Sequence, residues 1–249
     1  MSGLKDRLDE FVARIRSAAG ENLQSVIVYG SAASGELPDK YSDINLLCVL
    51  NSGSAAELKK IAPVVKWWSS TFRDKPPLFV TLHELRTSAD VFAIEMLDAK
   101  SNHRVLHGQD PLPAIDVQMN LHRIEVEHEL RTMLLRLRQQ YLLTPEDEGL
   151  LEQVLAKSLS SVLALLRHAM IAVGRSAPNS RQETVTMTRE VFGADVSALQ
   201  SVLDLREGRR PQADVTDLYR VYMDCLITVI ERIDKAVPLS QWRRVETSR

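Results

Sequence analysis

The sequence lacks several features that would place it in a special class of protein. It has two cysteines, Cys48 and Cys225, and each stands inside an apolar periodic segment, where cysteine behaves as a small buried hydrophobe, so a disulfide framework is excluded. Charge of one sign is also missing, because 31 basic and 33 acidic residues leave a net charge of -2. No whole-chain field therefore attracts a polyanion or an anionic membrane.

Long apolar runs are absent as well. The first 20 residues alternate charged and apolar side chains at helical spacing, unlike the unbroken apolar run of a signal peptide. No segment has the roughly 18 to 20 uninterrupted apolar residues of a membrane span. These absences predict a cytoplasmic protein with no membrane contact and no general nucleic-acid binding.

What is present predicts two domains in an α+β chain. With 45% hydrophobic and 26% charged residues, the 249-residue chain is long enough for two ordinary domains, each with its own core. Helices and strands alternate up to residue 85, which indicates an α/β layer. Prolines at 111 and 113 then punctuate a linker. We expect an α/β domain over residues 1–115, a helical bundle over 116–238 and a tail over 239–249.

The α/β domain is predicted from turn residues and apolar periods. A first helix should end at Gly20, and an apolar strand should cover 25–29. A second strand, 42–50, alternates Asp43, Asn45 and Leu47 with the apolar residues between them. A helix follows over about 51–72, with Pro63 expected to kink it or delay its start. A third strand is predicted over 77–85.

The bundle is predicted from caps and apolar stripes that recur at helical spacing. Its expected helices are one over 117–143, one opened by Thr144 and closed by Gly174, one from Ser180 to Gly193 with Glu183 at capping-box spacing, a short one from Asp195, and one from Asp214 to Pro238.

The chemistry concentrates in the stretch VIVYGSAASGELPDKYSDINLLCVL, residues 26 to 50. Gly30 and Ser31 come at a strand end, where free backbone N–H groups can receive a phosphate. Eleven residues then separate Ser31 from Asp43. Two acids at i and i+2 on a strand point the same way and can ligate divalent ions together, but here the second position is Asn45.

This order of elements and motif resembles the polymerase-beta-like nucleotidyltransferase superfamily. That family's signature is an apolar residue, Gly, Gly or Ser, nine to thirteen residues, then two acids flanked by apolar residues. Tyr29, Gly30, Ser31 and Asp43 match the signature and Asn45 departs from it. The bundle is similar to the substrate domain of aminoglycoside-modifying members and to the HEPN-like bundles that accompany this fold.

The resemblance implies transfer of a nucleoside monophosphate from a magnesium-bound nucleoside triphosphate to an acceptor. Gly30 and Ser31 would hold the triphosphate, and Asp43 with Asn45 would hold Mg²⁺. Two loop residues, Lys40 and Tyr41, are weaker candidates for nucleotide contact beside their interpretation as solvated loop. The family's third carboxylate lies on the next strand, where Thr81 and His83 are the facing residues here, so His83 is the candidate base.

Two functions therefore stay open. In the first, the chain is a nucleotidyltransferase with a depleted metal site that acts on a small-molecule or protein acceptor. In the second, it is a pseudoenzyme that kept nucleotide or partner binding after losing its acids, as Asn45 favours. The sequence leaves the oligomeric state open, a homodimer included.

Overall fold

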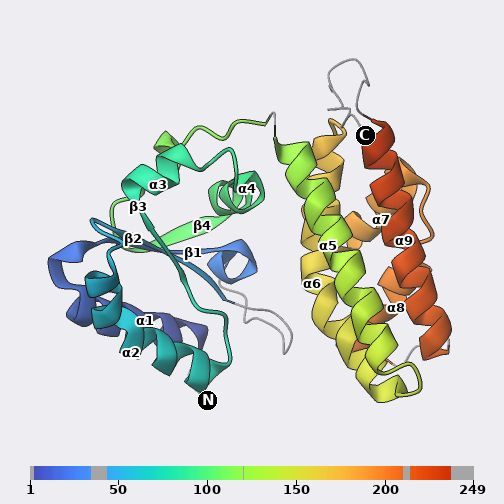
Figure 1. Cartoon of the computed structure of the whole chain (residues 1–249), viewed down its shortest axis with the longest axis horizontal. Helices are drawn as coiled ribbons and strands as arrows, with labels where there is room; N and C mark the ends of the chain where they lie inside the picture. The colour runs from blue at the N-terminus through green and yellow to red at the C-terminus, as the bar shows by residue number, and fades with distance from the viewer. Residues whose placement is uncertain (1–2, 35–43, 120, 210–213, 237–249) are drawn as a thin grey trace, which may run out of the picture. The chain divides into compact units, whose positions relative to one another are not determined.

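The protein is described by a computed structural model over residues 3–34, 44–119, 121–209 and 214–236. The chain divides into two compact units, Met1–His122 and Arg123–Arg249. The first carries a sheet with helices, and the described part of the second is helical (Figure 1). The expected α+β class, an α/β region followed by a helical bundle, is confirmed.

The first unit is built on a four-stranded mixed sheet in the order β3-β2-β1-β4. Its central strand β1 runs antiparallel to both neighbours, and β2 runs parallel to β3. As a result, the end of β1 lies level with the starts of β2 and β4. The strands are β1 (Leu23–Tyr29), β2 (Asn45–Leu50), β3 (Leu78–Thr81) and β4 (His103–Gly108).

Helices cover both faces of this sheet (Figure 1). One core, which includes Val28 and Cys48, packs against α1 (Leu4–Ala19) and α2 (Ala55–Phe72). The other core, which includes Ile27 and Leu47, packs against α3 (Leu82–Thr87) and α4 (Ala93–Ser101). Because neighbouring strand residues face opposite ways, both faces of β1 and β2 are apolar, as expected for central strands.

Most of the predicted elements of this unit are confirmed. Helix α1 stops at Gly20, which has a positive φ of 54°. Strand β1 begins two residues earlier than predicted. Strand β2 begins at Asn45 rather than at residue 42: Ile44 precedes the strand, and residues 42 and 43 lie outside the described residues. Pro63 lies within α2, whose start is set by Ser54 accepting the Glu57 N–H.

The prediction of one strand over 77–85 is wrong beyond Thr81. The Thr81 hydroxyl accepts the Glu84 N–H at 3.1 Å, and a Glu84 carboxylate oxygen accepts the Thr81 N–H at 2.7 Å. This reciprocal capping box satisfies free N–H groups at the start of α3. The local cap therefore ends the strand where the apolar pattern would have continued it.

The second unit is a bundle around α6, which packs against α7, α8 and α9. Ser180 caps α7 and Asp214 caps α9 as predicted, but Asp147 rather than Thr144 caps α6 by accepting the Leu150 N–H at 2.9 Å. The helices are α5 (His122–Leu143), α6 (Glu148–Ala172), α7 (Arg181–Phe192), α8 (Ser197–Arg206) and α9 (Val215–Lys235).

Helix α6 is long and apolar enough to cross a membrane by length and composition, with a mean hydropathy of 1.4. However, 56% of that window is buried inside the bundle. The core helix of a bundle passes the same test, so α6 is weak evidence for a span.

Candidate functional site

The end of β1 turns at Gly30 into a short 3-10 helix, Gly30–Ser34. Gly30 has a φ of +74°, which favours glycine. Its N–H donates to the Asn102 carbonyl at 2.9 Å, and the Asn102 side-chain amide donates to the Gly30 carbonyl at 2.9 Å. Since Asn102 directly precedes β4, this one residue holds both the N–H and the carbonyl of Gly30.

Asn45, the first residue of β2, lies against this corner. It pairs with Tyr29 across the antiparallel ladder, and a Cβ built on Gly30 would lie 3.2 Å from the Asn45 Nδ2 atom. The two halves of the motif, fifteen residues apart in sequence, thus lie side by side. We call Gly30, Asn45 and Asn102 the Gly30 corner; beside it, the Ser31 residue is exposed.

Three of the expected site residues, Lys40, Tyr41 and Asp43, lie outside the described residues.

Three side chains form a row across the sheet at this level. Tyr29 pairs with Asn45 on one side and with His103 on the other, so all three lie on the face covered by α3 and α4. Burial, together with Glu95 and Asp98 of α4, raises the pKa of Tyr29 to about 12. The two carboxylates therefore lie near Tyr29, the strand partner of Asn45.

Two features of this face were missed from the sequence. Glu95 and Asp98 have the i, i+3 spacing of one helical face, which was the available signal. One carboxylate oxygen of Glu95, Oε2, is buried and has no hydrogen-bond partner among the described residues. The other feature is the contact of His103 with Asp110, in which the His103 Nε2 lies 2.9 Å from an Asp110 carboxylate oxygen.

His83 lies elsewhere. The parallel register matches Thr81 with Leu50, at the far end of β2 from Asn45, and His83 follows in α3. Five residues at about 3.3 Å each separate the two ends of β2 by about 16 Å. Continued in the other direction, the same register brings Pro76 level with Asn45. The expectation that Thr81 and His83 face the motif is therefore wrong, and the level position carries no acid.

A carboxylate does lie next to the start of β2, outside any strand. Asp74 follows α2, is 9% exposed, and its Oδ1 accepts the N–H of Ile44 at 3.2 Å. Ile44 immediately precedes Asn45. Sequence spacing could not reveal this contact, because its partners are thirty residues apart.

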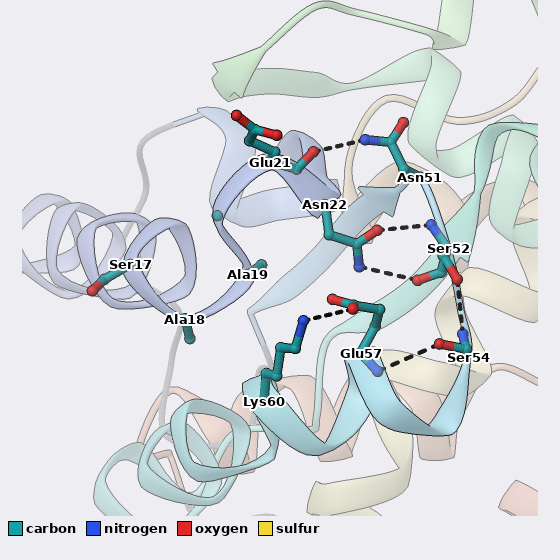
Figure 2. A pocket seen from close by; sticks show the side chains of 11 residues that line it. Ser17, Ala18, Ala19, Glu21, Asn22, Asn51, Ser52, Ser54, Glu57 and Lys60 are labelled. Atoms are coloured by element: carbon teal, nitrogen blue, oxygen red, sulfur yellow. Dashed lines mark hydrogen bonds and ion pairs between the residues drawn. The ribbon is translucent and has the colours of Figure 1, made fainter.

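The opposite end of the sheet has a surface pocket of about 650 Å³ (Figure 2). Its polar groups bond to one another: Asn22 exchanges hydrogen bonds of 3.0 and 2.8 Å with the Ser52 backbone. The Asn51 amide donates to the Glu21 carbonyl at 2.7 Å, and Lys60 pairs with Glu57 at 2.6 Å. These contacts stabilise the junction of β1, β2 and α2. Because the polar groups of this pocket already bond to protein, the Gly30 corner is the better candidate for a ligand site.

A divalent ion fits the corner only with ligands supplied in part by a bound molecule. Among the described residues, no three His, Cys, Asp or Glu side chains gather to hold a metal. Asn45 offers one neutral amide oxygen, a donor that hard cations accept. The described donors therefore do not by themselves form a closed protein site for a metal ion.

Comparison with known proteins gives a fold and no family. No family model and no curated protein matches the sequence. The structure matches that of spectinomycin adenyltransferase AAD(9) from Enterococcus faecialis, solved with ATP and spectinomycin. The TM-score is 0.59 at 13% identity, over 94% of this chain and 100% of that one. The chain thus has a nucleotidyltransferase fold, in agreement with the resemblance in its motif.

Proposed function

We propose that the protein binds a nucleoside triphosphate at the Gly30 corner and transfers its nucleoside monophosphate to a hydroxyl group of a small molecule. The observation that carries this proposal is the contact of Gly30 with Asn45 at the end of β1, in a chain with a nucleotidyltransferase fold. The matched adenyltransferase was solved with ATP and a small-molecule acceptor, which supports the same two kinds of ligand here.

The chain's own residues have distinct parts in this proposal. Gly30 leaves the corner open because it has no side chain, and the exposed Ser31 hydroxyl can donate to a phosphate oxygen. Asp43 and Asn45 would hold Mg²⁺, which when bound neutralises charge on the triphosphate. Lys40 and Tyr41 are the proposed further nucleotide contacts. His83 is not part of the site.

The reaction exchanges a phosphoanhydride bond of the triphosphate for a phosphodiester bond to the acceptor. The acceptor hydroxyl oxygen forms a bond to the α-phosphorus as the bond from that phosphorus to the bridging oxygen of the β-phosphate breaks. Pyrophosphate leaves with that oxygen, and the hydroxyl proton passes to a base or to water. Among the described carboxylates near Asn45, Glu95 and Asp98 are close enough to Tyr29, the strand partner of Asn45, to raise its pKa.

The amide at position 45 makes the metal site weak. A unit charge pair at about 4 Å is worth roughly 4 kcal/mol at an effective dielectric of about 20, and a dication doubles this as an upper bound. Even half of that bound corresponds to about three decades in affinity. The second candidate function, a nucleotide-binding pseudoenzyme, is favoured by this loss and by Pro76 at the position level with Asn45.

Calorimetry separates these functions. ATP, GTP, CTP and UTP are titrated with and without Mg²⁺ into the wild type and into Asn45→Asp. We expect binding that strengthens with Mg²⁺, and more so in the variant. Transfer of label from an α-³²P nucleotide to an aminoglycoside or related polyol would establish the enzyme, and binding without transfer would favour the pseudoenzyme. No binding by either protein would refute both.

A further inference from the structure

The segment between α2 and β3 has an uncommon backbone. Helix α2 ends at Phe72, and Arg73 adopts a left-handed conformation with φ 59° and ψ 22°. It is the one non-glycine residue with positive φ in the described ranges, and its N–H donates to the Ser69 carbonyl at 3.1 Å. Such a conformation persists where surrounding contacts require it. Here it turns the chain so that Asp74 enters the protein.

Asp74 is a buried carboxylate, and removing a carboxylate from water costs free energy. Only 9% of the residue is exposed, and its Oδ1 accepts the Ile44 N–H at 3.2 Å. A buried carboxylate is tolerated when hydrogen bonds compensate its lost hydration. The contact therefore joins two buried polar groups, each of which needs a partner.

The sheet itself does not supply this partner for Ile44. The paired residues of β2 and β3 begin at Leu47 and Leu78, and the ladder of β1 and β2 ends at the pair Tyr29 and Asn45. Ile44 thus lies just outside both ladders. The Asp74 side chain takes the place of a strand neighbour at this point.

Asn45 directly follows Ile44, and its side chain lies beside Gly30. A shift of the Ile44 backbone moves Asn45 relative to Gly30, at which an added Cβ would lie only 3.2 Å from the Asn45 Nδ2 atom. Asp74 is therefore connected to Asn45 through the single residue Ile44, from which it is thirty residues away in sequence.

We propose that Asp74 is a positioning residue of the candidate nucleotide site: its carboxylate fixes the Ile44 peptide and thereby holds Asn45 beside Gly30. This inference rests on the proposed nucleotide binding. It assigns to Asp74 no contact with the nucleotide. The hydrogen-bond acceptor, rather than the negative charge, is the property that matters.

Three full-length variants test this role. Asp74→Ala removes the acceptor, and Asp74→Asn keeps an oxygen acceptor without the charge. Ser54→Ala is the matched control, because it removes the cap at the other end of the same helix, about 27 Å away for 18 residues. Each protein is titrated with ATP and Mg²⁺ by calorimetry, and Ile44 amide exchange is followed by NMR.

We expect Asp74→Ala to speed Ile44 amide exchange about tenfold or more and to weaken ATP binding about tenfold, as loss of a hydrogen bond to a charged group predicts. Asp74→Asn should stay within about twofold of the wild type in both measurements, because an amide oxygen still accepts the bond. Ser54→Ala should melt earlier and bind ATP as the wild type does.

Unchanged ATP binding in Asp74→Ala would overturn the inference, as would an equal loss in Ser54→Ala, which would indicate a general effect of stability. If Asp74→Ala does not fold, the wild type still decides: an Ile44 amide that exchanges at the rate of an unprotected peptide overturns the inference. A wild type that binds no nucleoside triphosphate would instead refute the proposed function.

Discussion

Replacing Gly30 with alanine perturbs the corner in two ways. At a φ of +74°, an L residue is strained by about 1–2 kcal/mol. The added Cβ would also lie 3.2 Å from the Asn45 Nδ2 atom, so that side chain must move by a few tenths of an ångström. We expect Gly30→Ala to lower the free energy of unfolding by about 1–2 kcal/mol and to weaken ATP binding about tenfold, or 1.4 kcal/mol.

The control for this variant is Gly20→Ala. Gly20 has a φ of +54° in the same unit, but a Cβ there would meet nothing within 4 Å. It therefore carries the backbone strain without the contact with Asn45. We expect Gly20→Ala to be destabilised at least as much and to bind ATP with wild-type affinity.

Urea unfolding measures the stability of the first unit through tryptophan fluorescence. Two of the chain's three tryptophans, Trp67 and Trp68, lie in α2, and a Trp242→Phe background leaves emission from these two alone. Calorimetry with ATP and Mg²⁺ measures binding. Wild-type affinity in Gly30→Ala, or an equal loss of affinity in Gly20→Ala, would refute the assignment of the corner as the nucleotide site.

Three further predictions concern the same unit. Asn45→Asp should strengthen Mg²⁺-dependent ATP binding by one to about three decades, because it adds a charge to the metal site; no gain in calorimetry would contradict a metal at this position. Thr81→Ala should lower the free energy of unfolding by about 1 kcal/mol through loss of the α3 cap, with ATP affinity unchanged; weakened binding would place this end of the sheet in the site. Tyr29 has a folded pKa of about 12 against about 10 when unfolded, so its contribution is complete below pH 10 and is lost as pH rises to 12. In urea unfolding at pH 8 and 11, Tyr29→Phe should shrink the alkaline loss of stability by about 1.4 kcal/mol, and an unchanged loss would show that Tyr29 ionises freely.

The sequence predicted the elements whose causes are local. Apolar alternation identified β1 and β2, and the spacing from Gly30 to Asn45 identified the corner that the two strands form. The error at His83 was also local in origin, because Thr81 and Glu84 have the spacing of a capping box, which the strand pattern obscured. The start of α6 at Asp147 rather than Thr144 is a similar choice between two nearby caps.

The contacts that complete the site are not local, so spacing could not reveal them. Asn102 bonds to Gly30 from seventy-two residues away, and Asp74 bonds to Ile44 from thirty. Each of these bonds depends on the order of strands in the sheet. Glu95 and Asp98 approach Tyr29 only because α4 packs across that face.

The two ends of the sheet differ in how their polar groups are satisfied. At the end drawn in Figure 2, the Asn22, Asn51 and Lys60 side chains bond to neighbouring protein groups, so a ligand would have to displace protein contacts. At the other end, the backbone of Gly30 and Ile44 is held by Asn102 and Asp74, while Ser31 is exposed. A binding site benefits from a backbone that is already held in place beside exposed side chains. The conformational entropy of that backbone is then lost on folding and not on ligand binding. This difference favours the Gly30 corner independently of any likeness to known proteins.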